Sequence, residues 1–243
     1  MATLESATVI IRQEGLKAMT TAVAVRSDEE IQQDVMAEFS WDARLQPNEI
    51  GVAARDGIVT LTGSVDTFVK KWAAERAAQR VRAVRAVAND IEVRLPSSAE
   101  RSDADVAAAV TRSLEWDALV PADRIDVTVS KGWITLRGEV EWEYQRRTAE
   151  RAVRGLSGVR GVTNFIAVRP RVQPVPRELE RRIQEALVRS VETDANNIQI
   201  RIDAGQVTAT GTVRSWMEKQ EAERVVWSAP GVTSVINRIT IEP

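Results

Sequence analysis

Residues Gly132 to Val140 read GWITLRGEV, in which apolar side chains such as Ile134 and Leu136 alternate with mainly polar ones. Alternation with a period of two is typical of a β-strand with one buried face. Similar stretches are GIVTLTGSV from Gly57 to Val65 and GQVTATGTV from Gly205 to Val213. The copies are 75 and 73 residues apart, which is the length of a small domain. The sequence therefore predicts three copies of one fold.

The composition excludes several kinds of chemistry. The 243-residue chain has no Cys and no His, which removes disulfides, thiolate nucleophiles, imidazole bases and nearly all zinc sites. No pair of carboxylates has an evident acid–base spacing. We therefore expect no enzyme, no metal and no cofactor. The net charge is −2, and residues 96–170 and 171–243 each carry equal numbers of basic and acidic side chains, so we expect no nucleic-acid partner.

The first 26 residues belong to no repeat. They lack the basic start of a signal peptide, and no apolar run in the chain approaches the ~20 residues that span a bilayer. We therefore predict a cytoplasmic location, or a periplasmic one if the true start lies upstream. Residues 1–26 are expected to form a flexible tail, with an arm that docks on a neighbouring subunit as the alternative.

Each repeat begins with an amphipathic helix. Ser27 and Glu30 form a capping box, Ser102 begins the second such helix, and Pro176 begins the third, where a missing N–H is harmless. One face of each helix is apolar at a spacing of four residues. These positions are Ile31, Val35 and Phe39; Val106, Val110 and Leu114; and Leu179, Ile183 and Leu187.

Two glycines recur in each hairpin. The first supplies positive φ in a tight turn; its copies are Gly57, Gly132 and Gly205. The second replaces an inward side chain of the second strand, and predicts either a helix pressing close to the sheet or a bulge. Its copies are Gly63, Gly138 and Gly211.

A second helix starts near Thr67, Trp142 or Ser215 and carries an Ala-Glu-Arg motif, whose adjacent Glu and Arg are expected to be solvated. Gly158 and Gly231 are expected to end it. The last strand places an inward Asn that must find partners, and we expect these to be backbone groups at the sheet edge. The copies are Asn89, Asn164 and Asn237.

The order α-β-β-α-β predicts an α+β unit in which two helices cover one face of a three-stranded sheet. We place the units at residues 27–95, 103–169 and 176–243. Pro96 to Ser98 is expected to be a short flexible linker. Pro170 to Pro176 contains three prolines and is expected to be a stiff spacer.

The strand and helix pattern resembles the BON domain, which is named for bacterial osmotic-stress and nodulation proteins. It matches from Ile125 to Val140, Ala149 to Arg151 and Gly158 to Val168, with parallel matches in the other copies. The resemblance implies a small αββαβ domain without catalytic residues. It also implies links to stress tolerance, envelope integrity and phospholipid association. Some members resemble the ring-building modules of secretion systems, and one branch is associated with potassium binding.

Aromatic residues are the candidates for contact. Trp41 and Trp116 occupy equivalent positions and are expected to close the open end of their own cores. Trp133 and Phe165 are expected on the outer face of the second sheet, where they would form an apolar patch. Further candidates lie near the start of the second helix of each repeat. They are Lys70, Lys71, Trp72, Trp142, Tyr144 and Trp216.

Aromatics beside Lys or Arg suit a lipid headgroup layer or a protein interface, and we favour the interface. The sequence therefore predicts a non-enzymatic binding and assembly protein of tandem BON domains, related to stress. Its partner would be itself, as a homo-oligomer, or another protein. The alternatives are a peripheral phospholipid-binding protein of the envelope and a potassium-binding sensor module. The loop from Gly155 to Gly161 follows a helix, so it is expected to cap that helix rather than bind phosphate.

Overall fold

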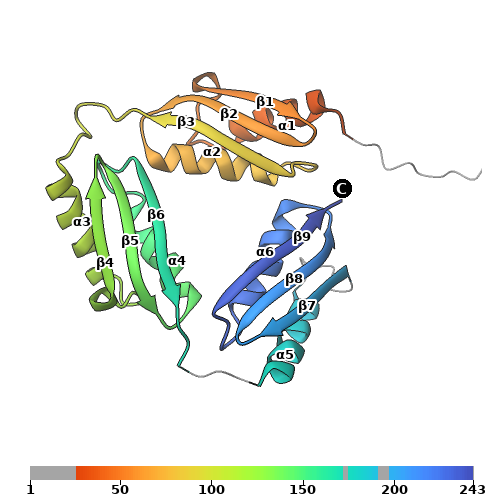
Figure 1. Ribbon diagram of the computed structural model, residues 1–243. Coiled ribbons are helices and arrows are strands. Elements are labelled where there is room, and N and C mark those ends of the chain that lie inside the picture. The colour runs from red at the N-terminus through yellow and green to blue at the C-terminus, as the bar shows by residue number, and fades with distance from the viewer. Residues whose placement is uncertain (1–25, 172–174, 191–196, 243) are drawn as a thin grey trace, which may run out of the picture.

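The computed structural model describes residues 26–171, 175–190 and 197–242. The predicted tail at residues 1–26 lies outside this part except for its last residue, and the proline-rich spacer is only partly within it. Three domains with the element order α-β-β-α-β follow one another along the chain (Figure 1). Each has a three-stranded sheet of its own. The predicted α+β fold is confirmed.

The first domain shows the topology that all three share. Its elements are α1 (Asp28–Trp41), a 3-10 turn η1 (Pro47–Glu49), β1 (Ile50–Arg55), β2 (Ile58–Val65), α2 (Phe68–Arg80) and β3 (Ala86–Val93). β1 and β2 form an antiparallel hairpin, and β3 pairs with β2 in parallel. After β2 the chain forms α2 and then returns as β3. Helix α1 packs on β1, α2 packs on β2 and β3, and the two helices contact each other, so both lie on one face of the sheet.

The other two domains repeat this arrangement. The second contains α3 (Asp103–Trp116), η2 (Ala122–Arg124), β4 (Ile125–Ser130), β5 (Trp133–Val140), α4 (Glu143–Val153) and β6 (Gly161–Val168). The third contains α5 (Pro176–Arg189), β7 (Ile198–Asp203), β8 (Gln206–Val213), α6 (Trp216–Trp227) and β9 (Ser234–Ile241). Their central strands are β5 and β8.

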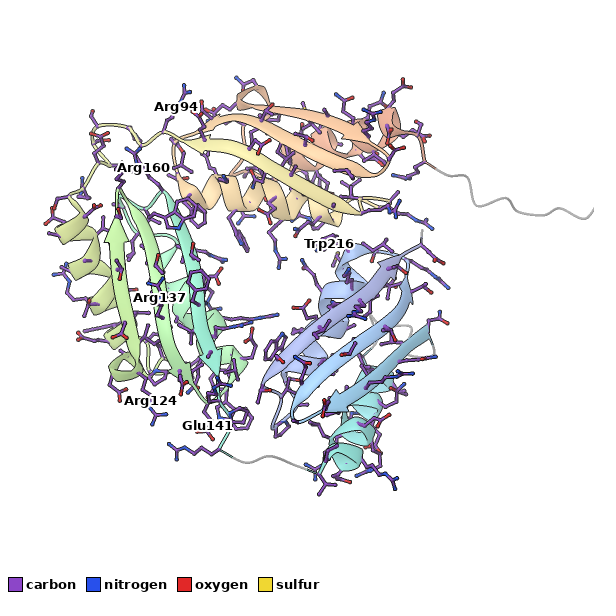
Figure 2. The ribbon with its side chains drawn as sticks, viewed as in Figure 1. Arg94, Arg124, Arg137, Glu141, Arg160 and Trp216 are labelled. Carbon is purple, nitrogen blue, oxygen red and sulfur yellow. The ribbon has the colours of Figure 1, made fainter. Side chains whose placement is uncertain are left out.

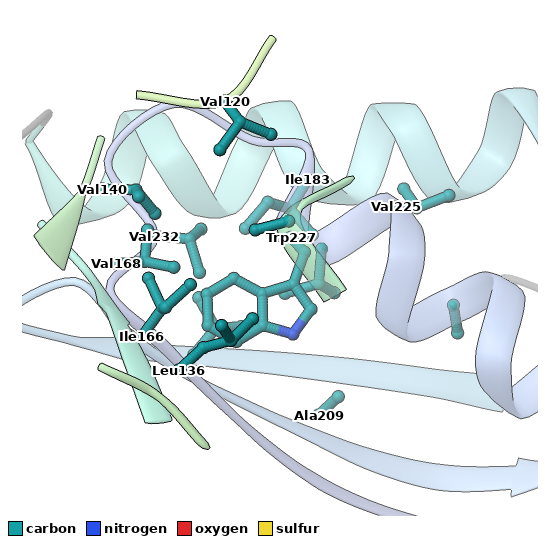
Figure 3. Packing of buried hydrophobic residues seen from close by; sticks show 14 of the residues in the cluster. Val120, Leu136, Val140, Ile166, Val168, Ile183, Ala209, Val225, Trp227 and Val232 are labelled. Carbon is teal, nitrogen blue, oxygen red and sulfur yellow. The ribbon is translucent and has the colours of Figure 1, made fainter. Parts of the chain in front are cut away.

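The predicted inward faces form the cores. Leu136 and Ile134 are fully buried, as are the three apolar positions of each first helix. The first domain has a core cluster of its own, whereas the cores of the second and third domains join into one cluster. Figure 3 draws part of the joint cluster, with the indole of Trp227 in the middle of the view. Trp227, at the end of α6, is 9% exposed.

The helix starts follow the sequence signals. Ser27 and Glu30 form the predicted capping box, with Ser27 accepting from the Glu30 amide and the Glu30 carboxylate accepting from the Ser27 amide. Ser102 accepts from the Asp105 amide. Pro176 occupies the first turn of α5. The two serines satisfy amide donors that have no partner within the helix, and the proline has no such donor.

The glycine on the inward face of the central strand is required neither by a close helix nor by a bulge, the two reasons that we expected. Gly138 has φ 136°, and a Cβ placed on it would collide with the carbonyl oxygen of Arg124, which lies just before β4. The close neighbour is therefore the backbone that leads into the first strand. It is not either of the covering helices. Gly63 and Gly211 meet the equivalent carbonyls in the other domains.

The Glu of each Ala-Glu-Arg motif is half-buried and accepts a hydrogen bond from the inward Asn, so the prediction that it is simply solvated was wrong. Asn164 donates from Nδ2 to the Arg146 carbonyl at 3.0 Å and to Glu150 Oε2 at 3.2 Å, and its Oδ1 accepts from the Ile166 amide at 3.1 Å. Asn89 and Asn237 bind the equivalent groups. The inward Asn thus ties the last strand to the second helix through backbone groups and a carboxylate.

Gly158 does not cap the second helix, because α4 ends five residues earlier, at Val153. It has φ 88° and lies in the turn that leads into β6, and Gly231 and Ala83 have positive φ at the equivalent places. The glycine-rich loop therefore serves the entry to the last strand. This corrects the expected helix cap.

Candidate interaction surfaces

The outer face of β5 and β6 carries Trp133 and Phe165, as the alternation predicts. Trp133 is paired with Gly161 across the two strands, and Phe165 is paired with Arg137. Neither helix of the domain covers this face, and the two side chains are 46% and 61% exposed. They lie on neighbouring strands but are separated along them by four residues, or about 13 Å at ~3.3 Å per residue.

Both aromatic rings are held in place by their neighbours. The indole of Trp133 lies against Gly161, where an added Cβ would collide with the ring, and its Nε1 donates to Thr163 Oγ1 at 2.8 Å. The guanidinium carbon of Arg137 lies 5.5 Å from the centroid of the Phe165 ring. Figure 2 labels Arg137 on the exposed side of the sheet. The patch is therefore a pair of ordered rings with an arginine beside one of them.

The equivalent face differs in the other domains. At the place of Trp133 the first domain has Ile58, which is 48% exposed, and the third has Gln206, which donates to Ser234 across the strands. The place of Phe165 is taken by Asp90 and Arg238. Only the second of the three domains presents two aromatic rings at these positions.

The helix-start candidates do not join this patch. Trp142 occupies the N-cap position of α4, nine residues after Trp133 and beyond the end of β5, and is half-buried. Tyr144 is 50% exposed. Lys70 pairs with Asp66 at 2.9 Å. Lys71 lies half-buried on α2, in the first domain, whereas the patch lies in the second.

Trp72 and Trp216 lie toward other domains. The guanidinium carbon of Arg154, from the second domain, is 3.7 Å from the centroid of the Trp72 ring. Trp216 is half-buried against the joint core cluster, and its Nε1 has no hydrogen-bond partner among the described residues. Figure 2 places Trp216 on the side of the third domain that faces the first. These two tryptophans belong to contacts within the chain.

Trp41 and Trp116 do not close their cores, and that prediction was wrong. They end α1 and α3 with 87% and 91% of their surface exposed. Each stands at a groove between the two helices of its domain, of about 660 Å³ beside Trp116 and about 380 Å³ beside Trp41. Arg112 lines the first groove, and Arg80 lines the second. Two equivalent exposed indoles beside arginines form a second candidate surface.

One carboxylate of the second helix is buried where two domains approach. Glu143 is 6% exposed, and its Oε1 accepts from Arg146 at 2.8 Å and from Arg147 at 3.2 Å. Burial raises the pKa of Glu143, although both guanidinium groups oppose the shift. The guanidinium carbon of Arg146 also lies 4.9 Å from the ring centroid of Trp227 in the third domain.

The described residues contain no cluster of carboxylates that could hold a metal ion. Within the same ranges, no helix has the length and apolarity required for crossing a bilayer.

The family model of the BON domain matches residues 27–94, 102–170 and 177–243. The chain belongs to the BON domain family. The three matches coincide with the three α-β-β-α-β units, so each unit is one BON domain.

Comparison with curated proteins found no match. Among solved structures, the chain is similar to CdsD of Chlamydia trachomatis, which is described as a structural protein of the type III secretion system. One such structure has 13% identity, a TM-score of 0.25, and coverage of 87% of this chain and 91% of that one. A structure of the C-terminal domain of CdsD has 11% identity, a TM-score of 0.25, and coverage of 90% and 100%.

The three BON domains share their cores and differ in their surfaces. The exposed indole at the end of the first helix occurs in the first and second BON domains, and Arg189 replaces it in the third. The aromatic pair on the outer sheet face occurs only in the second. Any contact that depends on these residues is therefore specific to particular BON domains.

Proposed function

We propose that this protein is a non-enzymatic binding and assembly protein that contacts a second copy of itself through the outer face of β5 and β6. The observation that carries this proposal is the exposed, ordered pair of Trp133 and Phe165 on a sheet face that no helix covers. A single exposed aromatic is ordinary. Two of them on one face, with Arg137 beside Phe165, have the composition of an interface centre.

The burial of these rings supplies a driving force for association. Covering most of a Trp side chain contributes on the order of 2–3 kcal/mol at ~25 cal/mol per Å². The hydrogen bond from Trp133 to Thr163 and the packing on Gly161 already restrict the indole. Little side-chain entropy is then lost when a partner covers it.

The test is the double variant Trp133→Ser with Phe165→Ser, analysed by light scattering over a series of protein concentrations. Because both side chains point away from the core, the fold and the thermal midpoint are expected to persist while the self-associated mass falls. The matched control is Ile58→Ser, at the position of Trp133 in the first BON domain, which should leave the mass unchanged. An unchanged mass in the double variant would refute self-association through this face.

A second function, peripheral phospholipid binding, is supported by Trp41 and Trp116. Indoles that are almost fully exposed, next to arginines, suit the boundary between headgroups and acyl chains. The double variant Trp41→Ser with Trp116→Ser should then lose co-sedimentation with liposomes that contain anionic phospholipid. The sheet-face double variant serves as the control and should sediment as the parent does. Equal sedimentation of both variants and the parent would refute a role for these indoles.

A further inference from the structure

The second helices of the three BON domains carry two sets of equivalent positions that meet across domain boundaries. Counted from the Ala-Glu-Arg motif, the position two residues before its Ala is the leading position, and the position five residues after its Ala is the trailing position. The leading positions are Trp72, Arg147 and Gln220. The trailing positions are Gln79, Arg154 and Trp227.

The first and second BON domains meet at Trp72. The trailing Arg154 of the second domain lies with its guanidinium carbon 3.7 Å from the centroid of the Trp72 ring. Arg76, one turn further along α2, lies 5.4 Å from the same centroid. Close by, a Cβ on Gly155 would be in ordinary contact with Val69. The residues that follow the trailing position of the second domain thus contact the start of α2.

Corresponding helix ends also meet between the second and third domains and between the third and first, although in the second domain the partner is the residue before the leading position. The trailing Trp227 stacks with Arg146, which immediately precedes the leading Arg147, at 4.9 Å. The leading Gln220 donates from Nε2 to the Oε1 of the trailing Gln79 at 3.2 Å. Each domain therefore contributes its leading end to one neighbour and its trailing end to the other.

This pattern is a head-to-tail contact that closes after three domains. Head-to-tail contacts produce a ring when the rotation closes and an open filament when it does not. Figure 1 shows the three domains around a common centre, with α2 on the inner side of the first domain. Helices α2 and α6 are adjacent although they belong to the first and last domains.

Two of the trailing residues are buried by these contacts, and Trp72, Arg154 and Gln220 are half-buried. Gln79 and Trp227 are each 9% exposed, although both lie at the ends of helices. Phe68, at the start of α2, packs against the joint core cluster of the second and third domains. A buried Gln requires hydrogen-bond partners. Gln79 has Arg76 and Glu75 of its own helix at 3.4 Å, and Gln220, from the third domain, donates to it at 3.2 Å.

The paired side chains are chemically matched, and each pair differs from the others. The first contact joins Trp to Arg, the second joins Arg to Trp with the roles reversed, and the third joins Gln to Gln. An exchange of neighbours would place Arg154 against Gln220, or Trp227 against Trp72, and would lose the stacking of guanidinium on indole. The pairs thus distinguish the correct neighbour from the wrong one.

We propose that the three BON domains form a closed ring within one chain, and that these matched pairs specify the order of the domains. The partner of each second helix is the next domain of the same chain. Peptide linkers join the first domain to the second and the second to the third. The contact between the third and first domains has no linker, so it is the contact that reports closure.

Cysteine pairs test closure directly, because the chain has no Cys of its own. The variant Gln79→Cys with Gln220→Cys should react with a short bis-maleimide to give a crosslink within one chain, with a yield that does not depend on protein concentration. The control pairs Gln79→Cys with Arg238→Cys, which lies on the outer sheet face of the same third domain and should not crosslink. Failure of the first pair, crosslinking only between chains, or equal yields for both pairs would overturn the proposal.

The role of the matched pairs is tested by converting the first contact into the third. Trp72→Gln and Arg154→Gln, made singly, should each increase amide hydrogen exchange at the start of α2 and the end of α4, because one partner is lost. The double variant recreates a Gln–Gln pair and should recover part of the protection. Exchange in the double variant equal to or greater than the combined effect of the single variants would show that the pairs carry no specificity.

Discussion

Replacement of Asn164 by Ala should destabilise the second BON domain strongly. The change removes two hydrogen bonds with backbone groups and one with the Glu150 carboxylate. A neutral hydrogen bond contributes ~1 kcal/mol net, and one to a charged group ~1.5–3 kcal/mol. The expected loss in unfolding free energy is therefore about 3.5–5 kcal/mol, measured by native-state hydrogen exchange of the amides of β5 and β6.

A double-mutant cycle isolates the part that depends on the carboxylate. Glu150→Ala, combined with Asn164→Ala, should show a coupling energy of about 1.5–3 kcal/mol. Asn237→Ala provides an internal comparison and should cost less, because its bond to the Lys219 carbonyl is longer, at 3.5 Å. A loss below about 1 kcal/mol at Asn164, or a coupling near zero, would refute the reasoning, because the Asn would then be solvated equally well in the unfolded chain.

Three further predictions concern the core, the backbone and a titrating group. Leu136→Ala, at a fully buried position, should cost roughly 2–5 kcal/mol in chemical denaturation, and a loss under half a kcal/mol would mean that the strand parity is wrong. Gly138→Ala should expose the β4–β5 amides to exchange, because its Cβ would collide with the Arg124 carbonyl at a φ of 136°; unchanged protection would contradict this. Hydrogen bonding from Arg44 lowers the pKa of Asp42 from 3.8 to about 2, so the stability that it contributes is present above pH 3.8 and is lost as the pH falls through about 2. Arg44→Gln should return the NMR titration midpoint of Asp42 toward 3.8, and an unmoved midpoint would exclude Arg44 as the cause.

The repeated strand was sufficient to predict the fold. Its period of two separates Leu136 and Ile134, which are buried, from Trp133, which is exposed. The spacing between the copies extended this assignment of buried and exposed faces to all three domains. The helix starts were equally readable, because a cap such as Ser27 acts on amides only three residues away. Local signals of this kind need no knowledge of distant parts of the chain.

The wrong predictions concern residues whose environment depends on a neighbour that is distant in the sequence or is a backbone group. The carbonyl of Arg124 that excludes a side chain at Gly138 has no side-chain signal of its own. Trp41 was placed in the core because its motif is repeated in the second domain. The helical period would have placed it correctly, because Trp41 is two residues beyond the buried Phe39 and therefore roughly 200° around the helix from it.

The domain contacts could not be read from the sequence for a different reason. The leading residues Trp72, Arg147 and Gln220 share no chemical type, so a comparison of the repeats marks them as variable surface. Their common place in the fold appears only in the contacts: Trp72 and Gln220 meet the trailing residues Arg154 and Gln79, and Arg146, beside Arg147, meets Trp227. Equivalent helix ends can thus meet in the same order and still use different side chains.

The contact between Gln79 and Gln220 has a mechanical consequence. It joins the first and last domains, and no linker spans it, so a pull on the two ends of the chain acts on this contact before it acts on any strand. A hydrogen bond between amide side chains separates under less load than a strand ladder, whose bonds share the force. The molecule should therefore lengthen in a first step, by opening at this seam, while all three sheets remain folded.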